Sequence, residues 1–305
     1  MIGDTRNYVP RDNGDGELGT SAKKWAKVNA LQVIINDVDI LEAVTSGALA
    51  TVPDMIHSAA LHNGLFRGKD LTAYFESGEM SAAIAAGTFN NIYIGDYITK
   101  AITVDGTTYN VKWEVADLDY FLHDGDTETT AHHVVMFPSV TIQTNVSMND
   151  TNTTAGGYLG SKMWTDVIPK YAAAIKAAFG AAHVLSHREL LTNVVNATAA
   201  SAAGANYVGT STNWTWADVD ANIPSEPMIY GGAVFGSSAY DVGNKTKQLS
   251  IFRFKKFNEG RKWFWLQAVV SATNFALADN YGHANSFGAS DSDGYGGVRP
   301  YFLLR

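Results

Sequence analysis

The densest cluster of side chains able to do chemistry is formed by residues 123–126 (His-Asp-Gly-Asp) together with His132 and His133. Imidazole and carboxylate groups are ligands for divalent metals. Their spacing matches no rigid ligand pattern. It favours instead a hydrogen-bonded loop beside a strand, with His133 turned inward and His132 outward. We therefore expect no metal site and no cofactor.

Carboxylates form a second candidate site. Asp117 and Asp119 flank Leu118 on a predicted strand, which allows both to face one side and to act as a general acid and base. A solvated strand face explains the same spacing. Asp117 and Asp119, together with Asp124, are the candidate acids if the protein is a hydrolase. The chain contains no GxxxxGK[ST], HExxH or GxSxG motif and no cysteine, so the usual catalytic signatures are missing.

The C-terminal region has the most distinctive composition. An aromatic, β-prone run at residues 262–266 leads into residues 268–297, which hold five Gly, four Ser, three Asn, three Asp, two Tyr and one His, but no Lys, Arg or Glu. Gly and Ser also occur in flexible linkers, where interspersed aromatic residues are not typical. Tyr, Ser, Asn and Gly in loops are typical of antibody binding surfaces. The composition is that of a ligand-binding surface or of a soluble surface loop.

The whole chain limits the possible classes of protein. Its 305 residues, 46% of them hydrophobic, suffice for one large domain or two ordinary ones. The net charge of −8 argues against nucleic acid as a partner, because affinity for phosphates comes from Lys and Arg. No apolar run is long enough to cross a bilayer, so no membrane insertion is expected. Residues 1–11 lack the pattern of a signal peptide, which indicates synthesis in the cytoplasm.

From residue 91 onward the sequence predicts strands, then helices, then strands. Helical spacing runs from Trp164 to Phe179 and ends at Gly180, and a capping box at residues 186–189 predicts a second helix. Asp105-Gly106 is a strong hairpin turn. Alternation predicts strands at 92–98 and 101–104, and further strands are expected at 107–115, 134–137, 140–142, 249–254, 263–270 and 298–304. This order is typical of an α+β fold.

The first ninety residues are expected to form two further parts. Residues 1–40 have little to pack on within one chain, so they form either an arm on their own domain or an intertwined oligomer. Residues 41–90 are assigned as a connector or neck, with helices at 58–61 and 80–86. GELGTSAKKWAKVNALQVI, residues 16–34, resembles a short repeat of phage tail-fibre and tail-associated proteins. That resemblance implies a fibre-like segment that forms a homotrimer and attaches to other tail proteins.

Residues 90–305 resemble the C-type lectin-like domains of phage and bacterial proteins. The resemblance rests on WFWLQAVV, on the stretch 268–297, on the ending GVRPYFLL, and upstream on MNDTNTTAGGYLGSKMW and FGAAHVLSHRELL. It implies, for residues 91–305, an α+β C-type lectin-like domain with two helices, antiparallel strands and long loops. In the variable proteins of diversity-generating retroelements, such a stretch is rewritten by adenine-directed mutagenesis and binds the ligand.

The resemblance implies a receptor-binding protein of the phage tail, made in the host cytoplasm and carried on the virion, with a bacterial surface protein or glycan as its receptor. A binding protein is favoured over an enzyme, since the formylglycine-generating enzymes of this fold class need cysteines. The alternatives are a tail-associated hydrolase of polysaccharide or peptidoglycan, and a structural collar or decoration protein. Adenine-directed change of Asn codons yields the residue types of the candidate ligand-binding residues, which are Asn274, Asp279, Asn280, Tyr281, His283, Asn285, Asp291, Asp293 and Tyr295.

Overall fold

The chain divides into two units, Met1–Pro53 and Asp54–Arg305. The computed structural model describes residues 34–35, 38–39, 59–195, 211–235, 247–292 and 296–305. In the first unit, strands β1 (Ile34–Ile35) and β2 (Val38–Asp39) form an antiparallel pair. The other residues of the expected trimerisation segment lie outside the described residues. Residues 59–90, expected to form a connector, belong to the second unit.

Three short helices open the second unit. They are α2 (Ala59–His62), α3 (Thr72–Glu76) and α4 (Glu79–Ala85). Helices were expected at 58–61 and 80–86, and both are present. Phe75 of α3 and Met80 and Ile84 of α4 are buried, so these helices add to the core of the unit.

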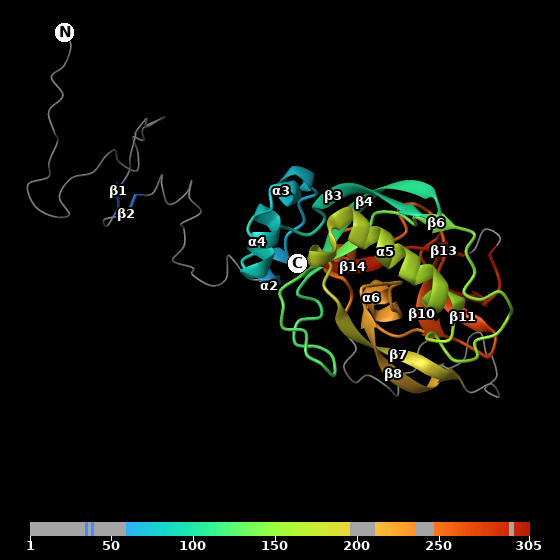
Figure 1. Ribbon diagram of the computed structural model, residues 1–305. Coiled ribbons are helices and arrows are strands. Elements are labelled where there is room, and N and C mark those ends of the chain that lie inside the picture. The colour runs from blue at the N-terminus through green and yellow to red at the C-terminus, as the bar shows by residue number, and fades with distance from the viewer. Residues whose placement is uncertain (1–33, 36–37, 40–58, 196–210, 236–246, 293–295) are drawn as a thin grey trace, which may run out of the picture. The chain divides into compact units, whose positions relative to one another are not determined.

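A five-stranded antiparallel sheet forms the centre of the second unit (Figure 1). Its strands, in spatial order, are β3 (Tyr97–Val104), β4 (Thr107–Leu118), β5 (Val134–Pro138), β14 (Tyr301–Leu304) and β9 (Ala221–Asn222). Asp105 and Gly106 have φ angles of 47° and 76°, as a tight hairpin between β3 and β4 requires. The two strands predicted at 92–98 and 101–104 are one strand that begins at Tyr97.

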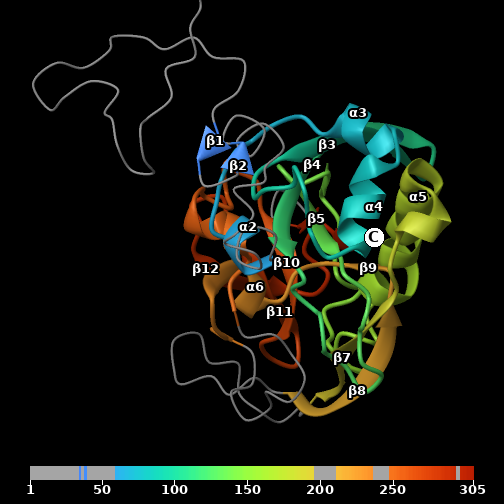
Figure 2. The ribbon, with the colours of Figure 1, turned by 90° about the vertical axis from the view of Figure 1, so that its left-hand side faces the viewer.

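Each face of this sheet is covered by a different part of the chain. On one face, the Trp113 and Phe302 rings lie 5.9 and 4.8 Å from that of Phe179, at the end of α5 (Ile168–Phe179). Helix α5 is the predicted helix, and its first turn follows a π-turn, η1 (Met163–Val167). On the other face, Phe137 packs against Phe252 of the 3₁₀ turn η3 (Ser250–Arg253). Figure 2 shows α4 and α5 on the opposite side of the sheet from β10 and β12.

Two predicted elements have the wrong type. The helix predicted after residue 186 is a strand, β7 (His187–Val195), which pairs with β8 (Ser211–Val219). Thr192, Val194 and Val195 favour a strand, and the pairing with β8 overrides a capping motif that acts only locally. The strand predicted at 249–254 is the 3₁₀ turn η3, and no strand forms at 140–142. Instead β6 (Gln143–Thr144) pairs with β13 (Gly297–Val298).

The stretch 268–297, predicted to be a ligand-binding surface or a surface loop, contains regular structure. Strands β10 (Phe264–Val269), β11 (Asn274–Ala278) and β12 (Ala284–Gly288) form an antiparallel sheet in that order. The remaining short helices are η2 (Ala181–His183) and α6 (Glu226–Tyr230). The fold is therefore mixed α+β with mostly antiparallel sheets, as predicted. Within the described residues, no helix combines the length and apolar character that a membrane span requires.

Candidate ligand-binding surface

The sheet β10–β11–β12 has a buried base. The Trp265 side chain is fully buried, and its Nε1 donates a hydrogen bond of 2.6 Å to the Val146 carbonyl. Leu277 stands opposite Trp265 in the register, and Phe275 is buried beside it. Trp263 is half-buried and packs edge-on against Phe287. The aromatic run and β11 thus form a buried scaffold for this sheet.

The turn between β11 and β12 is held by a buried carboxylate. Asp279 is 4% exposed, and its Oδ1 accepts hydrogen bonds of 2.8 Å from the backbone N–H groups of both Tyr281 and His283. Its Oδ2 lies 3.2 Å from His283 Nδ1. Asp279, predicted to contact ligand, is therefore a positioning residue that fixes the turn.

Two of the predicted ligand-binding residues point outward from this turn. Tyr281 is 65% exposed, and the His283 side chain is 75% exposed. Their rings stack with centroids 6.1 Å apart. The other candidates inside the described residues are half-buried, namely Asn274, Asn280, Asn285 and Asp291. Asp293 and Tyr295 lie outside the described residues.

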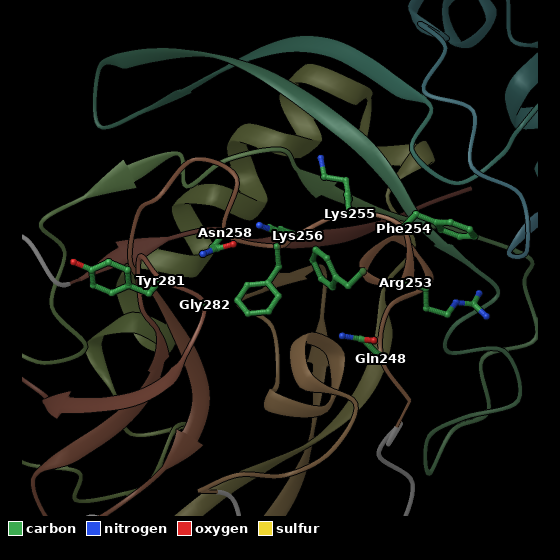
Figure 3. A pocket seen from close by; sticks show the side chains of 10 residues that line it. Gln248, Arg253, Phe254, Lys255, Lys256, Asn258, Tyr281 and Gly282 are labelled. Atoms are coloured by element: carbon green, nitrogen blue, oxygen red, sulfur yellow. The ribbon is translucent and has the colours of Figure 1, made fainter.

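A pocket of about 510 Å³ lies beside Tyr281. Its lining comes from Gln248, residues 252–258, Tyr281 and Gly282 (Figure 3). Asn258 joins the two segments, because its Nδ2 donates a hydrogen bond of 3.3 Å to the Asn280 carbonyl. A Cβ on Gly282 would lie 3.1 Å from the same Nδ2, so this position suits a glycine. The turn and the segment after η3 therefore form one surface.

The positively charged side chains around this pocket differ in whether an acidic side chain neutralises them. The Lys255 Nζ is 2.8 Å from both Glu114 Oε2 and Glu259 Oε2, so its charge is neutralised. Lys256 and Arg261 are exposed, and neither forms an ion pair within the part of the chain that the structure describes. The Arg261 guanidinium lies 6.0 Å from the centre of the Tyr281 ring, a cation–π contact.

Arg299, from the GVRP ending, anchors the backbone beneath this pocket. Its Nε donates to the Pro138 carbonyl at 3.0 Å, its Nη2 to Ser139 at 2.8 Å, and its Nη1 to the Phe257 carbonyl. Its guanidinium lies 4.4 Å from the centre of the Phe137 ring. Burial lowers the pKa of Arg299 to about 9. The residue ties β5, the chain end and the pocket segment together.

The predicted acid pair does not form. Strand β4 ends at Leu118, and Asp119 follows it with a φ of 56°, so the expectation that Asp117 and Asp119 share one strand face is wrong. The buried Asp117 accepts hydrogen bonds from Ser250 N at 2.9 Å and Ser250 Oγ at 2.7 Å. Burial raises the pKa of Asp117. Asp119 instead accepts from the backbone N–H of His133 at 2.9 Å, so the two acids have different partners.

The histidine cluster is a hydrogen-bonded loop, as expected. His133 is buried, and the His132 Nδ1 lies 2.7 Å from Asp119 Oδ2 at the surface. His123 pairs with Glu128. Asp126 binds Arg188 through two contacts, of 2.7 and 2.9 Å. No group of three or more acidic or imidazole side chains could hold a metal ion among the described residues.

Sequence reasoning missed the pocket residues outside 268–297. Residues 253–262 hold five Lys or Arg and one Glu in a chain with a net charge of −8. That local excess of positive charge was visible in the sequence. Its position next to Tyr281 was not, because it depends on how η3 packs on the central sheet.

Comparison with protein-family models, with curated proteins and with solved structures finds no significant match to this chain. The functional interpretation therefore rests on the side chains of the site and their geometry, since a fold class by itself does not define an activity.

Proposed function

We propose that this protein is the receptor-binding protein of a phage tail, a host adhesin that binds a bacterial envelope ligand through the surface around Tyr281. One observation carries the proposal: an exposed Tyr–His pair stands on a turn fixed by a buried carboxylate, beside a pocket and above an aromatic scaffold. Rigid aromatic side chains with few torsions lose little entropy on binding. Such residues are enriched at binding hot spots.

We propose further that residues 91–305 form a C-type lectin-like domain whose variable surface lies within 268–297. The division of labour along β10–β12 supports this assignment. Trp265, Phe275 and Leu277 are buried, whereas the Asn, Tyr and His positions at 280–285 are half-buried or exposed. Residues of the second group can change type at little cost to the fold, because surface substitutions usually change stability by less than about 0.5 kcal/mol.

A homotrimer would strengthen weak single-site binding. Three copies on one particle raise the effective concentration of each site after the first has bound, so avidity exceeds single-site affinity without any new contact. In this proposal residues 1–40 hold the three chains together and attach them to other tail proteins. The display surface then needs only modest affinity per copy.

The test is binding of labelled protein to a panel of bacterial cells. Tyr281→Ala combined with His283→Ala should abolish binding to the cells that the wild type recognises, while the melting temperature stays nearly unchanged because both side chains are exposed. His123→Ala, which removes an imidazole of similar exposure from another loop, is the control and should bind normally. A folded double variant that binds like the wild type would refute the proposal.

The same preparations separate a binder from the hydrolase alternative. Purified envelope polysaccharide or peptidoglycan is incubated with the protein, and soluble fragments are measured. A binding protein releases none, whereas a hydrolase releases product in proportion to time.

A further inference from the structure

We infer that the ligand of this surface is an acidic glycan, a sugar polymer that carries phosphate or carboxylate groups. The inference rests on the proposed function and names its ligand class. It comes from the charge and the chemistry of the pocket lining, which differ from those of the molecule as a whole.

Two adjoining hollows form one groove past Tyr281. The larger, of about 510 Å³, and a second, of about 380 Å³, share Lys256, Asn258 and Tyr281 in their linings. The second hollow adds Arg261 and Glu259. A groove that continues past the exposed ring suits an extended chain better than a single small molecule.

The groove carries positive charge that no acidic side chain among the described residues neutralises. The Glu259 carboxylate is already bound to Lys255, at 2.8 Å, which leaves Lys256 and Arg261 without an acidic partner among the described residues. The chain as a whole carries −8, so this is a local reversal of sign. A concave surface lined by one sign of charge attracts ligands of the opposite sign. Guanidinium groups pair with carboxylate and phosphate through two parallel hydrogen bonds.

The remaining lining fits a sugar. Tyr281 and Phe254, which are 65% and 45% exposed, lie at opposite ends of the larger hollow, and Lys256 and Asn258 lie between them (Figure 3). Exposed rings offer flat apolar faces on which the C–H faces of a sugar ring can pack. Gln248 donates to the Ile229 carbonyl at 2.7 Å, so its side-chain oxygen remains an acceptor for hydroxyl groups. Cations, rings and amides together match an acidic sugar chain.

Nucleic acid is the competing polyanion. Its affinity depends on neutralising many phosphates, whereas this groove has only three cations without an acidic partner within the described residues, namely Arg253, Lys256 and Arg261. This observation favours a glycan with spaced charges.

The experiment measures binding of the full chain to four probes at low and high salt. The probes are polygalacturonate, phosphomannan, neutral dextran and an oligothymidylate. We expect binding to at least one acidic polymer that weakens as salt rises, because the attraction is electrostatic, and no binding to dextran. The two acidic polymers distinguish carboxylate from phosphate recognition.

Paired variants locate the binding. Lys256→Gln with Arg261→Gln should weaken binding to the acidic polymer roughly tenfold or more, because two of the three groove cations that lack an acidic partner are lost. Lys69→Gln with Lys162→Gln removes the same net charge from positions outside the groove and should leave binding within about twofold of the wild type. Equal losses in the two double variants would overturn the inference.

Three other outcomes would overturn the inference. The protein would prefer the oligothymidylate to the acidic polymers, or it would bind dextran equally well, or it would bind neither acidic polymer while still binding cells. The cell assay separates the two proposals. If Tyr281→Ala with His283→Ala loses cell binding and Lys256→Gln with Arg261→Gln does not, the ligand class is wrong and the adhesin remains. If neither variant loses it, the proposed function fails as well.

Discussion

Trp265 and Asn285 lie in the same small sheet but contribute differently to stability. Trp265 is fully buried and hydrogen-bonded, whereas Asn285 is half-buried on β12. Trp265→Ala should therefore lower the free energy of unfolding by about 3–5 kcal/mol, and Asn285→Ala by at most about 0.5 kcal/mol. Urea denaturation of the two variants measures both values. Equal losses would contradict the division into scaffold and display surface.

His133 makes the stability depend on pH. Its Nδ1 donates to the Ala131 carbonyl at 3.0 Å, and its Nε2 accepts from the Phe121 N–H at 3.0 Å, so both nitrogens are satisfied in the neutral form. Burial lowers the pKa of His133 from 6.5 to about 4. Between these values the unfolded chain binds a proton that the folded chain does not. Stability should therefore fall by about 3 kcal/mol as the pH drops from about 6.5 to about 4.

The measurement is the free energy of unfolding at several pH values across this window. His133→Gln removes the titrating group and should flatten the pH dependence. Asn285→Ala, which removes no titratable group, serves as the control and should retain the wild-type slope. An unchanged slope in His133→Gln would show that other groups cause the acid sensitivity.

Among the elements, the loop before η1 packs very closely on β7. Gly157 has a φ of 65°, and a Cβ there would lie 2.6 Å from the Thr192 carbonyl oxygen. Gly106, in the β3–β4 turn, has a φ of 76° with no atom near its Cβ position. Both Ala variants incur the strain of a positive φ, so their difference isolates the clash. Gly157→Ala should therefore lower the free energy of unfolding by about 1–3 kcal/mol more than Gly106→Ala does, as measured by thermal unfolding. Equal losses in the two variants would contradict this close packing.

Elements with local signals were predictable from the sequence. The β3–β4 hairpin follows from Asp105-Gly106, and α5 from its apolar spacing and from Gly180 at its end. Helix α6 also carries local signals in the sequence, because Ser225 caps its first turn and Gly231 follows its last residue. Strand β7 was not predictable in this way, because its partner β8 lies beyond an intervening segment and the capping motif at 186–189 acts locally.

The candidate site was predictable only in part for the same reason. The composition of 268–297 indicated exposed aromatic residues, and Tyr281 is one. The role of Asp279 depends on where its carboxylate lies, which composition does not determine. The groove required residues 248–261 to meet the β11–β12 turn, and this contact is long-range.

For the whole molecule, the proposal predicts a trimer that depends on the first unit. Light scattering should give three times the chain mass for the full chain and a single chain mass for a version that begins at Asp54. Both forms should unfold with similar enthalpy per residue of the second unit, because that unit has its own core. A monomeric full-length chain would contradict trimerisation.

Within the described residues, the hydrogen bonds that Arg299 donates all go to main-chain oxygens, including that of Phe257. Every residue type presents the same carbonyl, so a substitution at Lys256, which precedes Phe257, leaves this anchor chemically unchanged. Under the proposed function, side chains of the groove can therefore vary while Arg299 holds the backbone of Phe257 in place. Ligand specificity would then change through side chains alone, without a new loop conformation.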